Sequence, residues 1–288
     1  MNKAQGRRQQ KQAKNQKRGR PAAASDLQAL LQEGLRAHQA GQLADAEAAY
    51  RRVLGLDADH ADANHLLGVI AHQVGDHGTA VELIGKAIQY NPAAAEYHCN
   101  LGNAIKGLGR LEDAVDSYNK AISLNPDMAI AHNNLGNTLQ ELRQLDQAVA
   151  SFRKALHIDP EYAEAHSNLA ETFREQGLFD EAVASCHKSL AINPNFAEAH
   201  GNLGAALHGM KRLDEAIASY EKALAINPNL AKAENNLGGV FFELGKLDEA
   251  VASYHKALAI KPGYLRAQWG ALLSLPILYT SENEIDIH

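Results

Sequence analysis

Residues 129–162 read AIAHNNLGNTLQELRQLDQAVASFRKALHIDPEY, and the flanking sequence repeats this pattern in register. Prolines mark the repeat, because six of them stand 34 residues apart: Pro92, Pro126, Pro160, Pro194, Pro228 and Pro262. A fixed period of this size indicates a solenoid built from one repeated supersecondary unit. A stack of such units forms a long surface more readily than a catalytic pocket, so the period favours a binding protein.

Two helical stripes of apolar residues lie within 129–162. The first runs through Ala131, Leu135, Leu139 and Leu142, and the second through Leu145, Ala148, Val149, Phe152, Ala155 and Leu156. The polar residues Arg143 and Gln144 separate the stripes. Pro160 ends the second stripe, because a residue before proline is pushed out of the α region. Each unit is therefore predicted to form two antiparallel helices.

Small residues recur at fixed positions of the repeat. One position is an alanine in the second helix: Ala46, Ala80, Ala114, Ala148, Ala182, Ala216 and Ala250. Another follows a leucine in the first helix: Gly68, Gly102, Gly136, Ala170, Gly204 and Gly238. Glycine inside a helix costs about 1 kcal/mol relative to alanine, so its recurrence indicates that helix backbones approach closely there.

The period and these positions resemble the tetratricopeptide repeat (TPR) family over residues 27–264. The resemblance implies an all-α fold, a right-handed superhelical solenoid of antiparallel helix pairs. Aligned on the prolines, residues 25–264 divide into seven units: 27–60, 61–94, 95–128, 129–162, 163–196, 197–230 and 231–264. Residues 265–288 are predicted to be a partial eighth repeat or a capping helix, followed by a C-terminal segment.

Charge is distributed unevenly along the chain. The net charge is −6, yet residues 1–21 contain eight basic and no acidic side chains, which leaves 20 basic and 34 acidic side chains elsewhere. Residues 1–24 are predicted to be a disordered basic tail, either a solvated arm or a segment that contacts nucleic acid or an anionic membrane. The acidic repeats themselves disfavour nucleic acid as a partner, because they repel phosphate.

The two cysteines indicate a reducing compartment. Cys99 and Cys186 lie at different positions in different units, which argues against a disulfide. No apolar run is long enough to span a membrane, and the N-terminus lacks the apolar stretch of a secretory signal. We therefore expect a cytoplasmic protein.

Asparagines are the candidate binding residues. One precedes the recurring leucine in five units, as Asn100, Asn134, Asn168, Asn202 and Asn236, and we call these five the asparagine ladder. Asn103 and Asn137 lie one position further along the same face. An amide both donates and accepts, which suits pairing with the backbone of an extended peptide. Resemblance to the repeats of O-GlcNAc transferases implies that such a ladder holds peptides on the concave face. The alternative is that these side chains bond within or between repeats and only orient the stack.

Other chemistries find little support in the residues. His98, His132, His166 and His200 share one repeat position, where packing between helices is expected, and no zinc motif occurs. The position before the ladder is never lysine, which disfavours a clamp for chaperone tails, and Lys232 is an isolated basic candidate. A recurring serine of the second helix is predicted to be exposed: Ser117, Ser151, Ser185, Ser219 and Ser253. We predict no catalytic residue, no metal and no cofactor.

Three functions follow in order of support. The first is a protein-interaction scaffold that binds an extended peptide or a partner segment in its concave groove. The second is the substrate-recognition region of an O-GlcNAc transferase or Spindly-type glycosyltransferase, because LPILYTSENEI from Leu275 to Ile285 resembles the segment that joins such repeats to the catalytic region. That catalytic region is absent from this chain. The third, a pentatricopeptide-like RNA binder, fits the acidic repeats poorly.

Overall fold

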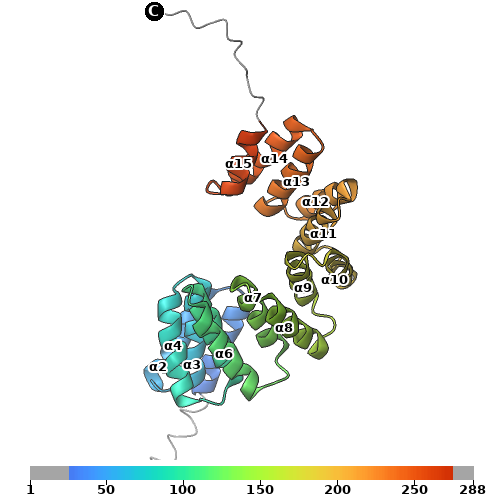
Figure 1. The fold of residues 1–288 in the computed structure, drawn as a ribbon. Coiled ribbons are helices and arrows are strands. Elements are labelled where there is room, and N and C mark those ends of the chain that lie inside the picture. Colours follow the sequence, from blue (N-terminus) through green and yellow to red (C-terminus); the bar gives the residue numbers. More distant parts are fainter. Residues whose placement is uncertain (1–25, 275–288) are drawn as a thin grey trace, which may run out of the picture. The chain divides into compact units, whose positions relative to one another are not determined.

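The computed structural model describes residues 26–274, which are helical with short connections and contain no strand. A helix over 26–39 comes first. It is followed by α2 (Leu43–Leu56), α3 (Ala61–Gln73), α4 (His77–Tyr90), α5 (Ala95–Gly107), α6 (Leu111–Leu124), α7 (Ala129–Glu141), α8 (Leu145–Ile158), α9 (Ala163–Glu175), α10 (Phe179–Ile192), α11 (Ala197–Gly209), α12 (Leu213–Ile226), α13 (Ala231–Glu243), α14 (Leu247–Ile260) and α15 (Leu265–Leu273). The prediction of an all-α fold of repeated helix pairs is confirmed (Figure 1).

The chain forms two compact units, Met1–Leu142 and Arg143–His288, here called the first and second units. Within the first, α3 packs on α4 and α5 on α6, and these pairs stack through α4 on α5. Within the second, α9 packs on α10, α11 on α12 and α13 on α14. Sequential pairing of short helices follows from the repeat, since each unit buries its apolar stripe only against its neighbours.

An Asp or Asn before five of the six recurring prolines ends the second helix, and Lys261 precedes Pro262. Asp159, after α8, has extended backbone angles (φ −129°, ψ 94°), and its carboxylate accepts a hydrogen bond from the Glu161 N–H at 3.1 Å. Asn193, after α10, repeats both features, with the Asn195 N–H at 3.2 Å. The proline therefore excludes further helix, and the preceding side chain fixes the turn.

A side chain at the histidine position closes the same turn. The His98 Nε2 donates to the Pro92 carbonyl at 3.1 Å, and His132, His166 and His200 contact Pro126, Pro160 and Pro194 in the same way. Asn64 and Gln268 occupy this position elsewhere and also donate to a carbonyl six residues back. These histidines therefore stabilise the boundary between repeats, a role that the expectation of simple packing did not include.

Helix pairs approach closely at the recurring glycine. A Cβ on Gly102 would lie 2.6 Å from the Tyr118 ring, and one on Gly204 would lie 2.8 Å from the Tyr220 ring. Ala170 has the equivalent position in α9, and the corresponding residue of α10 is the small, fully buried Cys186. Small and large side chains thus complement each other across the pair, as close-packed interiors require.

The prediction that the recurring serine is exposed is wrong. Ser117, Ser151, Ser185, Ser219 and Ser253 are all buried, with between 4% and 9% of their surface exposed. The hydroxyl of Ser117 donates to the Asp113 carbonyl, and that of Ser219 to the Glu215 carbonyl, at 3.0 and 2.8 Å. Because the hydroxyl bonds to a carbonyl of its own helix, serine can be buried at this position without leaving a polar group unpaired.

The connection within each helix pair uses a left-handed backbone. Five glycines have positive φ at this position: Gly41, Gly75, Gly109, Gly177 and Gly245. Arg143 and Lys211 occupy the same position with φ of 62°. Only glycine adopts this conformation without steric cost, so these two residues carry local strain.

The last described helix, α15, packs on α14 through Ala267 and Ala271. Its opposite face is exposed and apolar, with Trp269 and Leu272 largely accessible. Residues 1–24 and 275–288, for which a basic tail and a C-terminal segment are predicted, lie outside the described residues.

Both cysteines are buried and free, Cys99 in the first unit and Cys186 in the second. Among residues 26–274, no three His, Cys, Asp or Glu side chains come together as a metal site would require. No described helix has the length and apolarity needed to cross a membrane.

Candidate functional site

The asparagine ladder lies on the first helices of successive pairs. Asn100 on α5 and Asn134 on α7 belong to the first unit, together with Asn103 and Asn137. Asn168 on α9, Asn202 on α11 and Asn236 on α13 belong to the second unit. Every one of these side chains is partly exposed.

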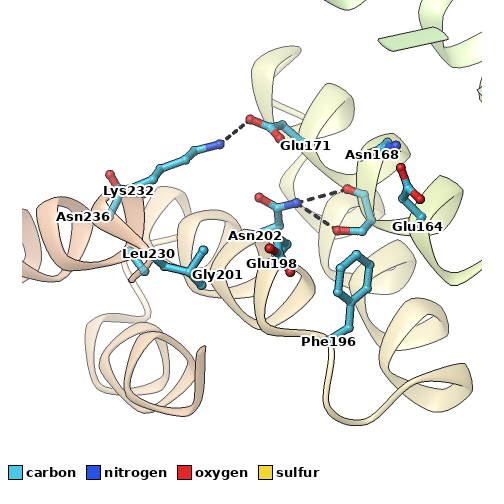
Figure 2. Close-up of a pocket in the computed structure, with 12 residues that line it drawn as sticks. Glu164, Asn168, Glu171, Phe196, Glu198, Gly201, Asn202, Leu230, Lys232 and Asn236 are labelled. Atoms are coloured by element: carbon cyan, nitrogen blue, oxygen red, sulfur yellow. Dashed lines mark hydrogen bonds and ion pairs between the residues drawn. The ribbon is translucent and has the colours of Figure 1, made fainter. Parts of the chain in front are cut away.

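Amide N–H groups of the ladder bond to the preceding repeat. Asn100 donates through Nδ2 to His65 Nε2 at 2.8 Å, and Asn134 donates to Asn103 Oδ1 at 3.0 Å. Asn202 donates to both the carbonyl and the hydroxyl of Ser167, at 3.2 and 3.0 Å (Figure 2). These three ladder residues therefore make the contacts between repeats that the alternative to peptide binding predicts. The Asn202 amide oxygen makes no hydrogen bond within the described chain, so it remains able to accept one.

A groove of about 380 Å³ opens on the first helices of the second unit. Three ladder residues line it, and so do residues of α9, α11 and α13 and of the connections before α11 and α13: Glu164, Ser167, Asn168, Glu171, Phe196, Glu198, Gly201, Asn202, Leu230, Lys232, Ala233 and Asn236 (Figure 2). Three polar amides therefore lie along one cavity, with Phe196 and Leu230 as its large apolar side chains.

Small residues keep this groove open. Gly201 lies in the middle of α11, and a Cβ built on it would have no atom within 4 Å. Ala233 on α13 and Ser167 on α9 are also short. Glycine costs about 1 kcal/mol relative to alanine inside a helix. No neighbouring helix packs against Gly201, so the missing side chain leaves open space in the groove.

Carboxylates dominate the charge of the groove. Glu164 and Glu198 are exposed, and neither makes a hydrogen bond or ion pair within the described residues. Lys232 on α13, the basic candidate of the sequence, extends to Glu171 on α9 and forms an ion pair with it (Figure 2). Within the part of the chain that the structure describes, no unpaired cation lines the groove, so the geometry does not resemble a site for a peptide carboxylate.

Bulky, buried residues stand at the corresponding positions of the first unit. Tyr97 on α5 is 4% exposed, stacks on His65 of α3 with ring centroids 4.3 Å apart, and donates its hydroxyl to Asp62. Burial lowers the pKa of His65 to about 4, although Asp62 opposes this shift, so the ring is neutral at physiological pH. Burial and the bond to Asp62 raise the pKa of Tyr97.

Tyr97, His65 and Gly201 are not among the site residues predicted from the sequence. Their signal in the sequence is a departure from the repeat. Every other 34-residue repeat has alanine at the position of Tyr97, as in Ala131, Ala165, Ala199 and Ala233. Gly201 also departs from the repeat, because no other 34-residue repeat has glycine at the position before the ladder residue. Positions that break the period therefore decide where the surface is filled and where it is open.

Comparison with known proteins agrees with this architecture. Models of the tetratricopeptide repeat family match residues 31–87, 107–143, 129–162, 161–229 and 195–263. No curated protein sequence gives a significant match.

Solved structures with the same fold include a tetratricopeptide repeat protein from Parabacteroides merdae ATCC 43184, at 17% identity and a TM-score of 0.70, with 87% of this chain and 99% of that chain covered. TTC0263, a thermophilic TPR protein of Thermus thermophilus, is 24% identical with a TM-score of 0.56, and the match covers 63% of this chain and 98% of that one. The MamA protein is 25% identical with a TM-score of 0.51, and the match covers 61% and 96%. The family matches, the helix pairs and these likenesses lead to one conclusion: the chain belongs to the tetratricopeptide repeat family.

Proposed function

We propose that the chain is a protein-interaction scaffold whose second unit binds an extended peptide in the groove of α9, α11 and α13. Proteins of the tetratricopeptide repeat family mediate protein–protein interactions, and a groove lined by three amides is the observation that carries the finer proposal. Its volume of about 380 Å³ lies in the range of pockets that bind small ligands or peptide side chains.

Backbone recognition follows from the orientation of the ladder. The Asn202 N–H groups are already used on Ser167, which leaves the amide oxygen to accept from a peptide N–H. Because an amide oxygen reads the peptide backbone and not its side chains, this contact supports binding of extended segments of varied sequence.

Apolar and rigid surroundings favour the same ligand. Phe196 and Leu230 offer contact area to one or two peptide side chains. Three packed helices carry the lining residues, so the groove exists before the ligand arrives and little conformational entropy is lost on binding.

Filling the groove tests the proposal directly. Gly201→His places a ring where the structure has open space, so we expect loss of binding with an unchanged or raised melting temperature. The matched control is Gly85→His, because Gly85 also lies inside a helix, on α4 of the first unit, with no atom within 4 Å of its added Cβ. The probe is a phage-displayed library of random linear peptides selected on the full chain.

The two variants separate the outcomes. Peptides that bind the wild-type chain and Gly85→His but not Gly201→His would support the groove. Peptides that bind all three proteins alike would place the binding surface elsewhere, and a selection that enriches no peptide would refute the proposed function.

The asparagine ladder is tested by truncation. Replacing Asn134, Asn168 and Asn202 together by alanine is expected to weaken peptide binding while helicity, followed by circular dichroism, is retained. Asn202→Ala also removes two hydrogen bonds to Ser167, so binding is compared at a temperature where circular dichroism shows the variant to be folded. Undiminished binding by the triple variant would remove the ladder from the site.

A second candidate role is substrate recognition for an O-GlcNAc transferase or Spindly-type glycosyltransferase. It uses the same groove, and its specific support is the resemblance of Leu275 to Ile285, which lies outside the described residues. A coding sequence for a nucleotide-sugar transferase immediately downstream of the codon for His288 would favour this role, and an unrelated sequence there would exclude it. In either role we propose a non-catalytic chain that acts in the cytoplasm.

A further inference from the structure

We propose that the groove of α9, α11 and α13 selects peptides that carry a lysine or arginine, and that Lys232 occupies the place of this cation while the groove is empty. The inference rests on the proposed function, because it names the class of ligand for the same groove. Charge complementarity, the position of Lys232 and the apolar lining each contribute one part of the argument.

Charge complementarity comes from the lining residues. The lining contains three carboxylates, those of Glu164, Glu171 and Glu198, and one ammonium group, that of Lys232, so it carries an excess of two negative charges. Glu164 and Glu198 have no partner within the described chain and are open to solvent. A cationic side chain is therefore attracted to the groove, and an acidic one is repelled.

Lys232 marks where a cation binds. Its ammonium reaches from α13 to Glu171 on α9, a residue two repeats away, and contacts it directly (Figure 2). The Lys232 side chain is 51% exposed and that of Glu171 is 27% exposed. Surface ion pairs of this kind contribute only about 0–1 kcal/mol, so a competing cation displaces Lys232 at small cost.

One neighbouring cation, Arg174, reduces the negative charge near the groove. Arg174 approaches Glu171 to 3.9 Å and Glu175 to 3.8 Å, but it does not line the groove. Arg174 lowers the negative potential at Glu171, but it makes no contact with Glu164 or Glu198. The acidic character of the groove therefore persists.

The apolar lining suits a long cationic side chain. Lysine and arginine bury their methylene stems on apolar surface while the charged end stays near water or a carboxylate. Phe196 and Leu230 provide such surface beside Glu198. A short acidic or polar side chain would use neither the apolar contacts nor the carboxylates.

Defined peptides test the selectivity on the full chain. Three fluorescein-labelled Gly/Ser peptides of equal length differ only in a central lysine, glutamine or glutamate. In fluorescence anisotropy at low salt we expect the lysine peptide to bind most tightly and the glutamate peptide about ten-fold more weakly. Added salt should reduce this difference, because it screens exposed charges.

Two matched variants locate the effect. Lys232→Met keeps the length of the side chain and leaves Glu171 with only the distant Arg174 at 3.9 Å, so the affinity for the lysine peptide should rise about three-fold. Lys211→Met changes the net charge equally but removes a partner of Glu243 outside the groove, and it should leave the affinity unchanged. Glu198→Gln, which breaks no contact in the described chain, should lower the affinity for the lysine peptide about three-fold.

The outcomes distinguish this inference from the proposed function. Equal binding of the three peptides, or an equal effect of Lys211→Met and Lys232→Met, would overturn cation selectivity and leave peptide binding intact. Failure of all three peptides, when the random library also enriches none, would overturn both. Should Lys232→Met lower the melting temperature, unchanged affinity of the well-folded Glu198→Gln variant would still overturn the selectivity.

Discussion

The two units repeat one pattern and yet present different surfaces. On the first, the buried rings of Tyr97 on α5 and His65 on α3 stack on each other. On the second, glycine and alanine stand at equivalent positions, as Gly201 and Ala233, and a groove of about 380 Å³ lies there. The backbone is the same in both cases, so the difference arises from single side chains.

This contrast separates two kinds of residue in a solenoid. Those that recur, such as Gly102 and Gly204 beneath Tyr118 and Tyr220, set the distance between helices. Residues that depart from the repeat, such as Gly201 in the groove, set the shape of the exposed face. The following substitutions exchange features between the units and so break or sharpen the comparison.

The largest effect is expected for Tyr97→Ala, which gives the first unit the alanine found at this position of the second. The ring is buried and stacked on His65, and its removal also leaves Asp62 without a partner, so stability should fall by about 3 kcal/mol. Urea unfolding followed by circular dichroism measures the loss. A loss below about 1 kcal/mol would show that the stack only covers the surface.

Gly102→Ala and Gly204→Ala probe where the units are alike. Each new methyl group would lie under 3.0 Å from a tyrosine ring of the paired helix, so overpacking should cost about 1–3 kcal/mol in either unit. Gly85→Ala is the control, because its methyl group enters open space and should stabilise α4 slightly. Thermal melts that ranked Gly85→Ala with the other two would contradict the packing assigned to the recurring glycine.

Glu234 differs from His98 at the position that closes the repeat boundary. A histidine there donates to a proline carbonyl, whereas a carboxylate cannot, and the buried Glu234 Oε2 has no partner in the described residues. Gln268 shows that glutamine can donate, at 3.1 Å to Pro262. Glu234→Gln should therefore raise stability by about 1 kcal/mol at neutral pH.

The pH dependence of this gain has a definite sign. Burial raises the pKa of Glu234, which Lys256 opposes at 3.8 Å, so the folded chain holds the proton more tightly than the unfolded chain. The contribution of Glu234 to stability therefore falls as pH rises above the ordinary pKa of a glutamate, about 4.3, and the advantage of Glu234→Gln should grow as pH rises from there. Melting curves with a constant difference as pH rises would rule out titration of Glu234 as the cause.

The smallest effect is expected for Lys211→Gly, which gives the second unit the residue found at Gly109 of the first. Relief of the left-handed strain at φ 62° is worth about 1 kcal/mol, and loss of the exposed ion pair with Glu243 subtracts part of it. A net gain of about 0.5 kcal/mol should appear in urea unfolding. Gly109→Lys is the reverse exchange and should destabilise, and a gain there would refute the strain.

The sequence predicted the helix pairs and the position of the ladder because both follow from a period. It could not rank the two roles of the asparagines, since the bond from Asn202 to Ser167 depends on how neighbouring repeats are rotated. The serine prediction failed for a similar reason: Ser117 is polar, but its hydroxyl is satisfied within its own helix. The groove itself depends on Gly201, which departs from the repeat, and a departure alone does not show whether the neighbouring helices leave open space there.

Each unit contains one free, buried cysteine, whose reaction with an alkylating reagent measures local unfolding of that unit. Burial raises the pKa of the Cys99 thiol to about 11 and that of Cys186 to about 12, so neither forms the thiolate that an alkylating reagent attacks while its unit is closed. The rate of alkylation at either cysteine therefore measures how often its own unit opens locally. Mass spectrometry after a brief pulse of iodoacetamide gives the extent of alkylation at Cys99 and at Cys186 separately. Comparison with and without peptide then shows whether a ligand bound to the second unit changes local unfolding of the first.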